Sequence, residues 1–420
     1  MTAVPAVSRP NLIRHPDFVK LWVAESISMA GSQISQLAIP LLAIVLLNAS
    51  AFEVGLLTSV GFLPFLLFGL PAGVWVDRLR RRPILIAADV GRALLLATIP
   101  LAWLLGSISL PQLYLVTFLA GILTVFFDVG YQSYLPSLVH SSQLMEGNGK
   151  LEMSRASAQV AGPGLAGALV QLAGAPLAIA IDALSFVASG LFLVAIRRPE
   201  AQPGVDRPRT SMLVDIREGL RFVLGHPLLR PITAATAIAN LFSAIASSVM
   251  LIFAVRELLL DPVLIGAIIA VGSSGGVVGA LIATRVQRRI GVGRTMILCE
   301  AGFAAGYLLL PVASVAAPVF LATLGLFLAT LGSIVFSIVG LTLRQRMAPT
   351  RMQGRTNATV RTINWGVLPI GFFVGGVLGT IIGIVPTLIV GALGLLLATL
   401  PILFSPVRTL REMPLAVEAD

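Results

Sequence analysis

The chain has 420 residues, of which 57% are hydrophobic and 11% are charged. Because soluble domains carry about a quarter charged residues, this composition excludes a water-exposed fold and predicts a multi-pass membrane protein. Lysine and arginine outnumber aspartate and glutamate by 29 to 19, and they gather in turns between apolar stretches. We therefore expect these charges to face anionic lipid at the cytoplasmic membrane surface, and we expect no nucleic-acid partner.

Twelve apolar stretches approach the length of about 20 residues that a membrane-spanning helix needs. They cover residues 18–47, 54–76, 83–105, 111–135, 152–173, 176–196, 229–255, 263–284, 294–312, 317–343, 356–382 and 386–404. Basic residues gather in every second connection, which the positive-inside rule places in the cytoplasm. The predicted fold class is therefore an all-α membrane protein with twelve transmembrane helices and both termini cytoplasmic. The first stretch is too long for a signal-peptide core, so we expect it to be retained.

The two halves of the chain repeat each other at a nearly constant offset. The matched pairs, 209 or 211 positions apart, are His15 with His226, Gly55 with Gly266, Asn148 with Asn357, Gly162 with Gly371, and Gly167 with Gly376. This repeat predicts two pseudo-symmetric six-helix bundles, over residues 1–196 and 229–420. A substrate site is then expected between the bundles, near the middle of the membrane.

Residues 197–228 form a polar cytoplasmic linker between these predicted bundles. In its second part, Met212, Ile216, Leu220 and Val223 recur at helical spacing. This spacing predicts an amphipathic helix that lies on the membrane surface.

Residue types that bind metals or perform catalysis are sparse. The chain has three histidines without metal-ligand spacing, and its one cysteine, Cys299, cannot form a disulfide within the chain. No nucleophile–base pair and no phosphate-binding glycine loop occurs. We therefore expect neither an enzyme nor a cofactor, and we expect a proton gradient to supply the energy. The expected partner is a small-molecule substrate, and the expected oligomeric state is a monomer.

A short basic turn separates the second and third apolar stretches. Gly73 is expected to let its helix pack closely against a neighbour, and Asp77 lies one helical turn later on the same face. Arg78, Arg81 and Arg82 follow and offer partners to that acid. The pattern Gly73-x-x-x-Asp77-Arg78-x-x-Arg81-Arg82 resembles the signature loop of the major facilitator superfamily. This resemblance implies a transporter that works by rocking two bundles.

Further stretches resemble the exporter branch of that superfamily, which includes enterobactin exporters and macrolide efflux proteins. They are residues 21–31, 88–92, 127–138 and 181–186. The resemblance implies a multi-pass protein of the bacterial inner membrane that exports drug-like or siderophore-like molecules. It also implies that Asp128 completes a charge relay with Asp77 and Arg81.

The fifth apolar stretch contains Gly162, Pro163 and Gly167. Proline removes a helix hydrogen bond and glycine admits a close neighbour, so these residues predict a kink and a packing site. They also resemble the Gly-Pro motif that exporters of the superfamily carry in the fifth helix. That likeness implies export as the direction of transport.

Ionisable residues inside the predicted spans are functional candidates. An isolated charge at the centre of a helix costs about 2.5–3.5 kcal/mol on insertion scales, so we expect Glu25 to stay protonated until water reaches it. This behaviour suits proton coupling; the alternative is a hydrated Glu25 near the membrane surface. Asp182 is expected either to bond between helices or to take part in coupling, and Glu300 poses the same question as Glu25. Asp89 and Arg92, three residues apart, are expected to form a structural pair.

Neutral polar and aromatic residues inside the spans are candidates for lining the substrate cavity. They are Gln33, Gln36, Gln132, Gln159, Asn240, Phe336, Asn364 and Trp365. Such a lining suits an amphipathic cargo, so the predicted function is proton-coupled export of a drug-like or siderophore-like molecule by alternating access. Two alternatives remain open: import or facilitated diffusion of a metabolite on the same fold, and translocation of lipid.

Overall fold

The computed structural model describes residues 12–140, 143–198, 200, 212–349 and 352–414, and in these residues it has helices but no strand. The helices are η1 (Leu12–Arg14), α1 (Pro16–Val45), α2 (Ala51–Arg78), α3 (Arg81–Leu104), α4 (Leu110–Leu138), α5 (Leu144–Ala173), α6 (Ala175–Val194), α7 (Met212–Gly225), α8 (Leu229–Arg256), α9 (Pro262–Ile290), α10 (Val292–Val312), α11 (Pro318–Met347), α12 (Gln353–Ile381), α13 (Ile384–Leu397), α14 (Thr399–Leu403) and η4 (Pro406–Thr409). Eleven helical segments of the described chain are long and apolar enough to cross a membrane. This result confirms the all-α membrane fold.

Helix α5 is the expected span that is missing from those eleven segments. It has 30 residues, but its first half carries Glu146, Lys150, Glu152 and Arg155. A membrane-spanning helix must be mostly apolar over about 20 residues, and this polar start lowers the hydropathy of α5. The number of twelve spans therefore stays a prediction, although α5 packs within the helix bundle against α1 and α9.

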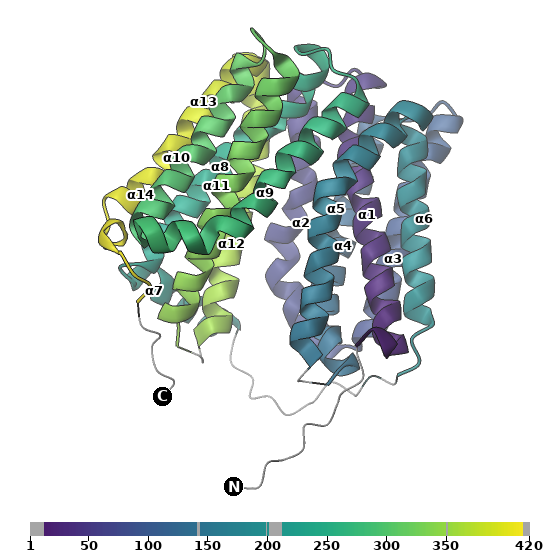
Figure 1. Ribbon diagram of the computed structural model, residues 1–420. Coiled ribbons are helices and arrows are strands. Elements are labelled where there is room, and N and C mark those ends of the chain that lie inside the picture. Colours follow the sequence, from purple (N-terminus) through teal and green to yellow (C-terminus); the bar gives the residue numbers. More distant parts are fainter. Residues whose placement is uncertain (1–11, 141–142, 199, 201–211, 350–351, 415–420) are drawn as a thin grey trace, which may run out of the picture.

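The helices form two groups, α1–α6 and α8–α14, that stand side by side in Figure 1. In the first group α1 packs against α5 and α6, α3 packs against α4 and α6, and α2 packs against α4. Each of these contacts has a counterpart in the second group, where α8 packs against α12 and α13, α10 against α11 and α13, and α9 against α11. The main contacts between the groups join α2 to α12 and α5 to α9. The arrangement is thus two-fold pseudo-symmetric.

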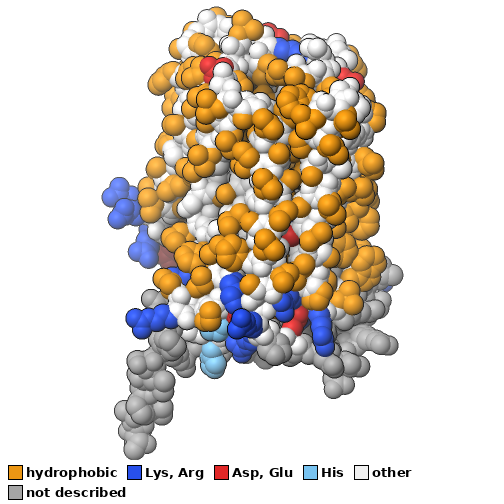
Figure 2. Space-filling model, turned by 90° about the vertical axis from the view of Figure 1, so that its right-hand side faces the viewer, with side chains coloured by type: hydrophobic (Ala, Val, Ile, Leu, Met, Phe, Trp, Pro, Cys, Tyr) orange, Lys and Arg blue, Asp and Glu red, His pale blue; other side chains and the backbone are white. Residues whose placement is uncertain are grey.

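The two ends of the molecule differ in charge. We call the end that carries Arg81, Arg198, Arg288 and Arg344 the basic end, and the opposite end the far end. Figure 2 shows hydrophobic side chains over most of the side of the molecule, while most of the visible Lys and Arg side chains gather near one end. A side surface of this kind suits the hydrocarbon core of a bilayer.

The first helix of each group starts in the same way. The His15 side chain accepts a hydrogen bond from the Phe18 N–H at 3.2 Å and so caps α1. Before α8, the His226 side chain accepts from the N–H of Leu229, the first residue of the helix, at 3.4 Å and from the preceding Leu228 N–H at 3.2 Å. Both histidines satisfy N–H groups that the start of a helix leaves without a partner. The offset between these two histidines therefore reflects a shared local structure.

The linker contains the predicted helix, α7. Val223 is fully buried, whereas Leu220 is exposed; the side chains of Met212 and Ile216 lie outside the described residues. Gly219 lies against α12, where a Cβ added to it would be 3.0 Å from the Arg355 carbonyl oxygen. Helix α7 is therefore packed against the second group of helices.

Candidate functional site

Pairs of glycines join the two helix groups near the far end. A Cβ added to Gly55 of α2 would lie 2.6 Å from the Cα of Gly376 in α12. A Cβ added to Gly167 of α5 would lie 3.0 Å from the Cα of Gly266 in α9. Neither position has room for a side chain, so the helices touch through their backbones. These four glycines belong to two of the pairs that define the sequence repeat.

Hydrogen bonds add to this contact between the groups. The Arg256 guanidinium donates to the Ala49 carbonyl at 2.8 Å, and the Phe52 N–H donates to the Thr380 hydroxyl at 3.1 Å. Arg256 is the one basic residue in the far-end connections of the sequence, and its bond to a backbone carbonyl explains its place there. Together with the glycines, these bonds hold the far end closed.

Aromatic rings continue the contact between α2 and α12 toward the middle of the molecule. Phe62 stacks on Phe372 with 5.2 Å between ring centroids, and Phe65 lies 5.2 Å from Trp365. Such pairs stabilise an interface beyond the area that they bury. The contact ends at Trp365, where two cavities begin.

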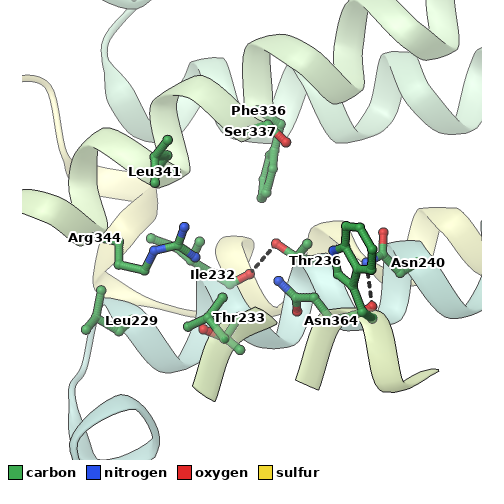
Figure 3. Close-up of a pocket in the computed structure, with 13 residues that line it drawn as sticks. Leu229, Ile232, Thr233, Thr236, Asn240, Phe336, Ser337, Leu341, Arg344 and Asn364 are labelled. Atoms are coloured by element: carbon green, nitrogen blue, oxygen red, sulfur yellow. Dashed lines mark hydrogen bonds between the residues drawn. The ribbon is translucent and has the colours of Figure 1, made fainter. Parts of the chain in front are cut away.

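The first cavity, which we call the C-terminal cavity, has a volume of about 250 Å³ and lies between α8, α11 and α12. Its lining residues are Leu229, Ile232, Thr233, Thr236, Asn240, Phe336, Ser337, Gly340, Leu341, Arg344, Val360, Asn364 and Trp365. Four of the predicted cavity residues therefore come together here: Asn240, Phe336, Asn364 and Trp365. Figure 3 shows the Asn240 side chain bonded to the Asn364 carbonyl, a contact of 2.7 Å.

The second cavity, which we call the interface cavity, has a volume of about 230 Å³ and is lined by both helix groups. Asp128 of α4 and Arg361 of α12 lie on its wall, and the charge of Arg361 acts on Asp128. The Arg361 guanidinium also lies 5.0 Å from the centre of the Trp365 ring. Since Trp365 lines both cavities, the two are neighbours.

The structure corrects the predicted relay between Arg81 and Asp128. Arg81 lies 3.4 Å from Glu200, and its N–H donates to the same carboxylate at 2.8 Å. Asp128 lies ten residues before the end of α4 at Leu138, which is about 15 Å along the helix. Asp128 is thus too deep to pair with the start of α3, and it belongs to the interface cavity.

Other parts of the basic turn also differ from expectation. A Cβ added to Gly73 would meet no atom within 4 Å, so the predicted close packing at Gly73 is wrong. Arg82 donates to the Leu193 and Val194 carbonyls at 3.0 and 2.6 Å and so binds the end of α6. The side chains of Asp77 and Arg78 lie outside the described part of the structure.

Glu200 acts as a cap for α3. Besides the bond from Arg81, its carboxylate accepts the Arg82 N–H at 3.1 Å, and only 4% of its side chain is exposed. A carboxylate is favoured at this position because the start of a helix carries partial positive charge. We expect Glu200→Ala to lower the free energy of unfolding by about 1–2 kcal/mol. Unfolding of the purified protein in a neutral detergent measures this loss. Glu257→Ala, at an exposed site, is the control, and equal stability of the two variants would contradict the capping role.

A buried cluster of charges lies inside the first helix group. Asp89 and Arg92 form the predicted pair at 2.5 Å, and Ser189 of α6 donates to Asp89 at 2.6 Å. The Arg92 guanidinium lies 4.3 Å and 4.1 Å from the ring centroids of Phe127 and Phe186. Charge, hydrogen bonding and aromatic faces all stabilise the buried Arg92.

Glu25 belongs to the same cluster. It is 3% exposed, and its Oε2 atom is buried without a hydrogen-bond partner in the described chain. The charges that act on it are those of Asp128, Arg92, Arg155 and Asp89. The alternative of a hydrated Glu25 at the membrane surface is therefore wrong for this conformation, because the side chain is enclosed by protein.

The other two acids lie apart from the cavities. Asp182 of α6 is buried and accepts a hydrogen bond from Ser185 at 3.0 Å, facing Gly31 of α1. This placement agrees with a role between helices. Glu300 of α10 is buried, and its Oε2 atom has no partner. Neither acid lines the C-terminal cavity or the interface cavity.

The four predicted glutamines line neither of these two cavities. Gln33 instead packs against α5, where a Cβ added to Gly162 would lie 2.6 Å from its Cγ atom. The remaining three, Gln36, Gln132 and Gln159, are exposed. The contacts of Gly162 and Gly167 confirm that the Gly-Pro stretch around Pro163 is a packing site.

Sequence reasoning missed several cavity residues. Arg361 lies inside a predicted span, and ionisable residues inside spans are functional candidates whether they are acidic or basic. Thr233 and Thr236 precede the predicted Asn240 at the spacing of one helix face, a signal that is present in the sequence. Arg344 stands at the end of its span, where its charge by itself indicates only a cytoplasmic helix end. Its direction into a cavity depends on tertiary structure.

Comparison with known proteins agrees with this architecture. A family model described as Major Facilitator Superfamily matches residues 21–371. The multidrug efflux pump Tap of Mycolicibacterium fortuitum is 27% identical over 426 residues, covering 97% of this chain and 99% of that protein. Macrolide efflux protein A of Streptococcus pyogenes is 26% identical over 203 residues, covering 48% of this chain and 50% of that protein.

A solved structure shows the same fold. The crystal structure of a bacterial homologue of the iron transporter ferroportin in an inward-facing state has a TM-score of 0.72 at 18% identity. The match covers 94% of this chain and 98% of that one. Family and fold are thus those of membrane transporters and not of enzymes. The efflux relatives support the exporter branch that the sequence motifs resemble.

Proposed function

Since the chain belongs to the major facilitator superfamily, we propose that it exports amphipathic drug-like or siderophore-like molecules in exchange for protons. The observation that carries this proposal is Glu25, a buried carboxylate in a charge cluster that reaches the interface cavity through Asp128. The efflux relatives support export as the direction. The proposed location is the cytoplasmic membrane of a bacterium.

The proposed topology has twelve spans, with α5 as the fifth. The basic end faces the cytoplasm by the positive-inside rule, so both termini are cytoplasmic and anionic lipid contacts the arginines there. Residues 1–196 and 229–420 form the two moving bundles, and residues 197–228 link them. The transporter works as a monomer.

The proposed cycle alternates between closing the far end and closing the basic end. In the described structure, backbone contacts such as Gly55 with Gly376 close the far end. We propose that this is the state that takes up cargo from the cytoplasm. Release outside then requires the far-end contacts to separate while the basic ends of the bundles approach each other.

The buried cluster links a proton to this movement. Glu25 and the charged groups that act on it comprise three carboxylates, those of Glu25, Asp89 and Asp128, and the two guanidinium groups of Arg92 and Arg155. One added proton therefore brings these five groups to neutrality. A proton that reaches Asp128 removes its attraction to Arg361 of the other bundle, across the interface cavity. Loss of that proton restores the attraction. The protonation state therefore changes how strongly the bundles are held together.

The energy of one proton is sufficient for this work. A potential of about 100 mV supplies about 2.3 kcal/mol per charge, and one pH unit adds about 1.4 kcal/mol. Together they sustain a concentration ratio of roughly 500 for a neutral cargo.

Efflux in inside-out membrane vesicles tests the proposal. Vesicles with an acidified lumen should accumulate members of a drug panel that includes a macrolide, and a protonophore should abolish this accumulation. We expect Glu25→Gln to lower gradient-driven accumulation by more than about tenfold, because without the energy of the proton the sustained ratio of roughly 500 falls toward one. The exposed Glu257→Gln variant is the control.

The same vesicles distinguish the alternatives. Accumulation that does not depend on the pH gradient would overturn proton coupling. Full activity of Glu25→Gln would show that Glu25 does not take part in the coupling. Movement of the panel only in the opposite direction would show import. Redistribution of a fluorescent lipid in proteoliposomes, without movement of the panel, would show a lipid translocator.

A further inference from the structure

The C-terminal cavity contains a guanidinium group for which the described part of the chain supplies no counter-ion. Arg344 belongs to the last turn of α11, and Figure 3 shows its side chain pointing into the cavity. Its Nε atom is buried and has no hydrogen-bond partner among the residues that the structure describes. None of the residues that line this cavity is an aspartate or a glutamate. The charge of Arg344 is therefore unbalanced within the cavity wall.

Other arginines at the basic end of the described chain differ from Arg344 in this respect. Arg82 donates to two carbonyls at the end of α6, and Arg198 donates to the Leu138 carbonyl at 2.5 Å. Arg346, two residues after Arg344, donates to the Pro414 carbonyl at 3.2 Å. The need for positive charge at a cytoplasmic helix end explains Arg346 as well as it explains Arg344. It does not explain why one of the two points into a cavity.

Polar atoms around Arg344 complete a site for a charged group. Thr233 and Asn364 approach the cavity from α8 and α12 (Figure 3), and the Thr233 hydroxyl and the Asn364 amide N–H groups are donors that an anion can accept from. The Thr236 hydroxyl, in contrast, is already bonded to the Ile232 carbonyl at 2.9 Å. Thr233 and Asn364, rather than Thr236, therefore add hydrogen-bond donors to the cavity that Arg344 enters.

Apolar residues line the rest of the cavity. Phe336 and Leu341 of α11 face Leu229 and Val360 of the neighbouring helices. A volume of about 250 Å³ is slightly below the usual range of ligand pockets, about 300–1,000 Å³. The cavity therefore accepts one ring system with its attached polar group, and a larger molecule must extend toward the interface cavity.

We infer that the C-terminal cavity binds the anionic oxygen group of an amphipathic molecule, with Arg344 as its counter-ion. A planar guanidinium matches a carboxylate, sulfonate or phosphate through paired hydrogen bonds. The apolar body of the molecule packs against Phe336 and Leu341. Identification of this molecule as cargo rests on the proposed function, whereas binding of the anion does not. The same chemistry occurs in a free solute and in the headgroup of an anionic lipid.

Equilibrium binding to the full-length protein tests this inference. The protein is placed in nanodiscs of phosphatidylcholine and titrated by calorimetry with naphthoate and with its neutral isostere, naphthamide. We expect naphthoate to bind more tightly. Arg344→Gln should lower the affinity for naphthoate by at least about tenfold, because hydrogen bonds to charged groups contribute about 1.5–3 kcal/mol. The same substitution should leave the affinity for naphthamide unchanged, and this unchanged binding also shows that the variant is folded.

Two further variants make the result specific. Arg346→Gln removes a charge of the same helix end that lies outside the cavity, and it should change neither affinity. Arg344→Lys keeps the charge without the planar geometry, so its affinity for naphthoate should lie between those of the wild type and Arg344→Gln. Equal binding of naphthoate by the wild type and Arg344→Gln would overturn the inference.

A second set of nanodiscs, rich in phosphatidylglycerol, distinguishes the two sources of the anion. If naphthoate affinity falls in these discs for the wild type but not for Arg344→Gln, the anion site stands and a lipid headgroup competes for it. An unchanged affinity supports a free solute as the ligand. Since no proton gradient is present, failure of proton-driven export leaves both results intact.

Discussion

Replacement of Asp89 by asparagine is expected to lower the free energy of unfolding by about 3–5 kcal/mol. The change keeps the size of the side chain but removes the charge that pairs with Arg92 at 2.5 Å. Arg92 then remains buried between α3 and its neighbours, and its guanidinium has lost the carboxylate with which it forms a salt bridge. Removal of one partner of a buried ion pair destabilises a protein far more than replacement of both partners, because it leaves a buried charge unpaired.

Thermal and denaturant unfolding in a neutral detergent measure this effect. The double variant Asp89→Asn with Arg92→Gln should recover part of the lost stability, because it leaves no uncompensated charge. The exposed Glu257→Gln variant should behave as the wild type. If Asp89→Asn alone were as stable as the wild type, Arg92 would have to find another partner, such as Asp128.

Replacement of Gly55 by alanine is expected to shift the transporter away from the state described here. The new Cβ would lie 2.6 Å from the Cα of Gly376, closer than carbon atoms can approach. Overpacking of this kind costs about 1–3 kcal/mol, which corresponds to a shift of roughly tenfold or more in the population of the closed far end. In the proposed cycle, export should fall because the state that takes up cargo from the cytoplasm becomes rare.

Labelling by a membrane-impermeant maleimide measures the shift. Cys299 is the only cysteine, so its replacement by alanine gives a background for a single cysteine at Ser59, which is buried between α2 and α12. Gly55→Ala should raise the labelling rate from outside by about tenfold. Gly302→Ala is the control, since a Cβ there would meet no atom within 4 Å. Equal rates in the three proteins would show that Gly55 does not close the far end.

Local sequence patterns were sufficient to predict the helices and some of the site. Apolar stretches of membrane length became helices, and a spacing of three residues placed Asp89 beside Arg92. Asn240 and Asn364 line a cavity, as expected for polar residues within apolar helices, which need partners or water; their role in binding substrate stays a prediction. The helices and the Asp89–Arg92 pair depend on residues that are neighbours along one helix, which is why the sequence alone reveals them.

The remaining features depend on contacts between distant parts of the chain. Glu200 meets Arg81 across 119 positions, and no local pattern distinguishes it from other linker charges. The resemblance to the superfamily suggested Asp128 as the partner of Arg81 instead. The same limit applies to Arg344, whose neighbour Arg346 has the same charge and helix position but a different direction. Only tertiary packing separates the two.

The glycine contacts at the far end follow the rule of a two-fold symmetric dimer. Gly55 touches Gly376, while their counterparts in the repeat, Gly266 and Gly167, touch each other. In an isologous interface, residue i of one subunit contacts residue j of the other, and j contacts i. A single six-helix half therefore already carries both surfaces needed to pair with a copy of itself. If the sequence of such a half were duplicated and the two copies fused into one chain, this interface would be preserved without any new contact. The residues that line the cavities could then change independently in the two halves.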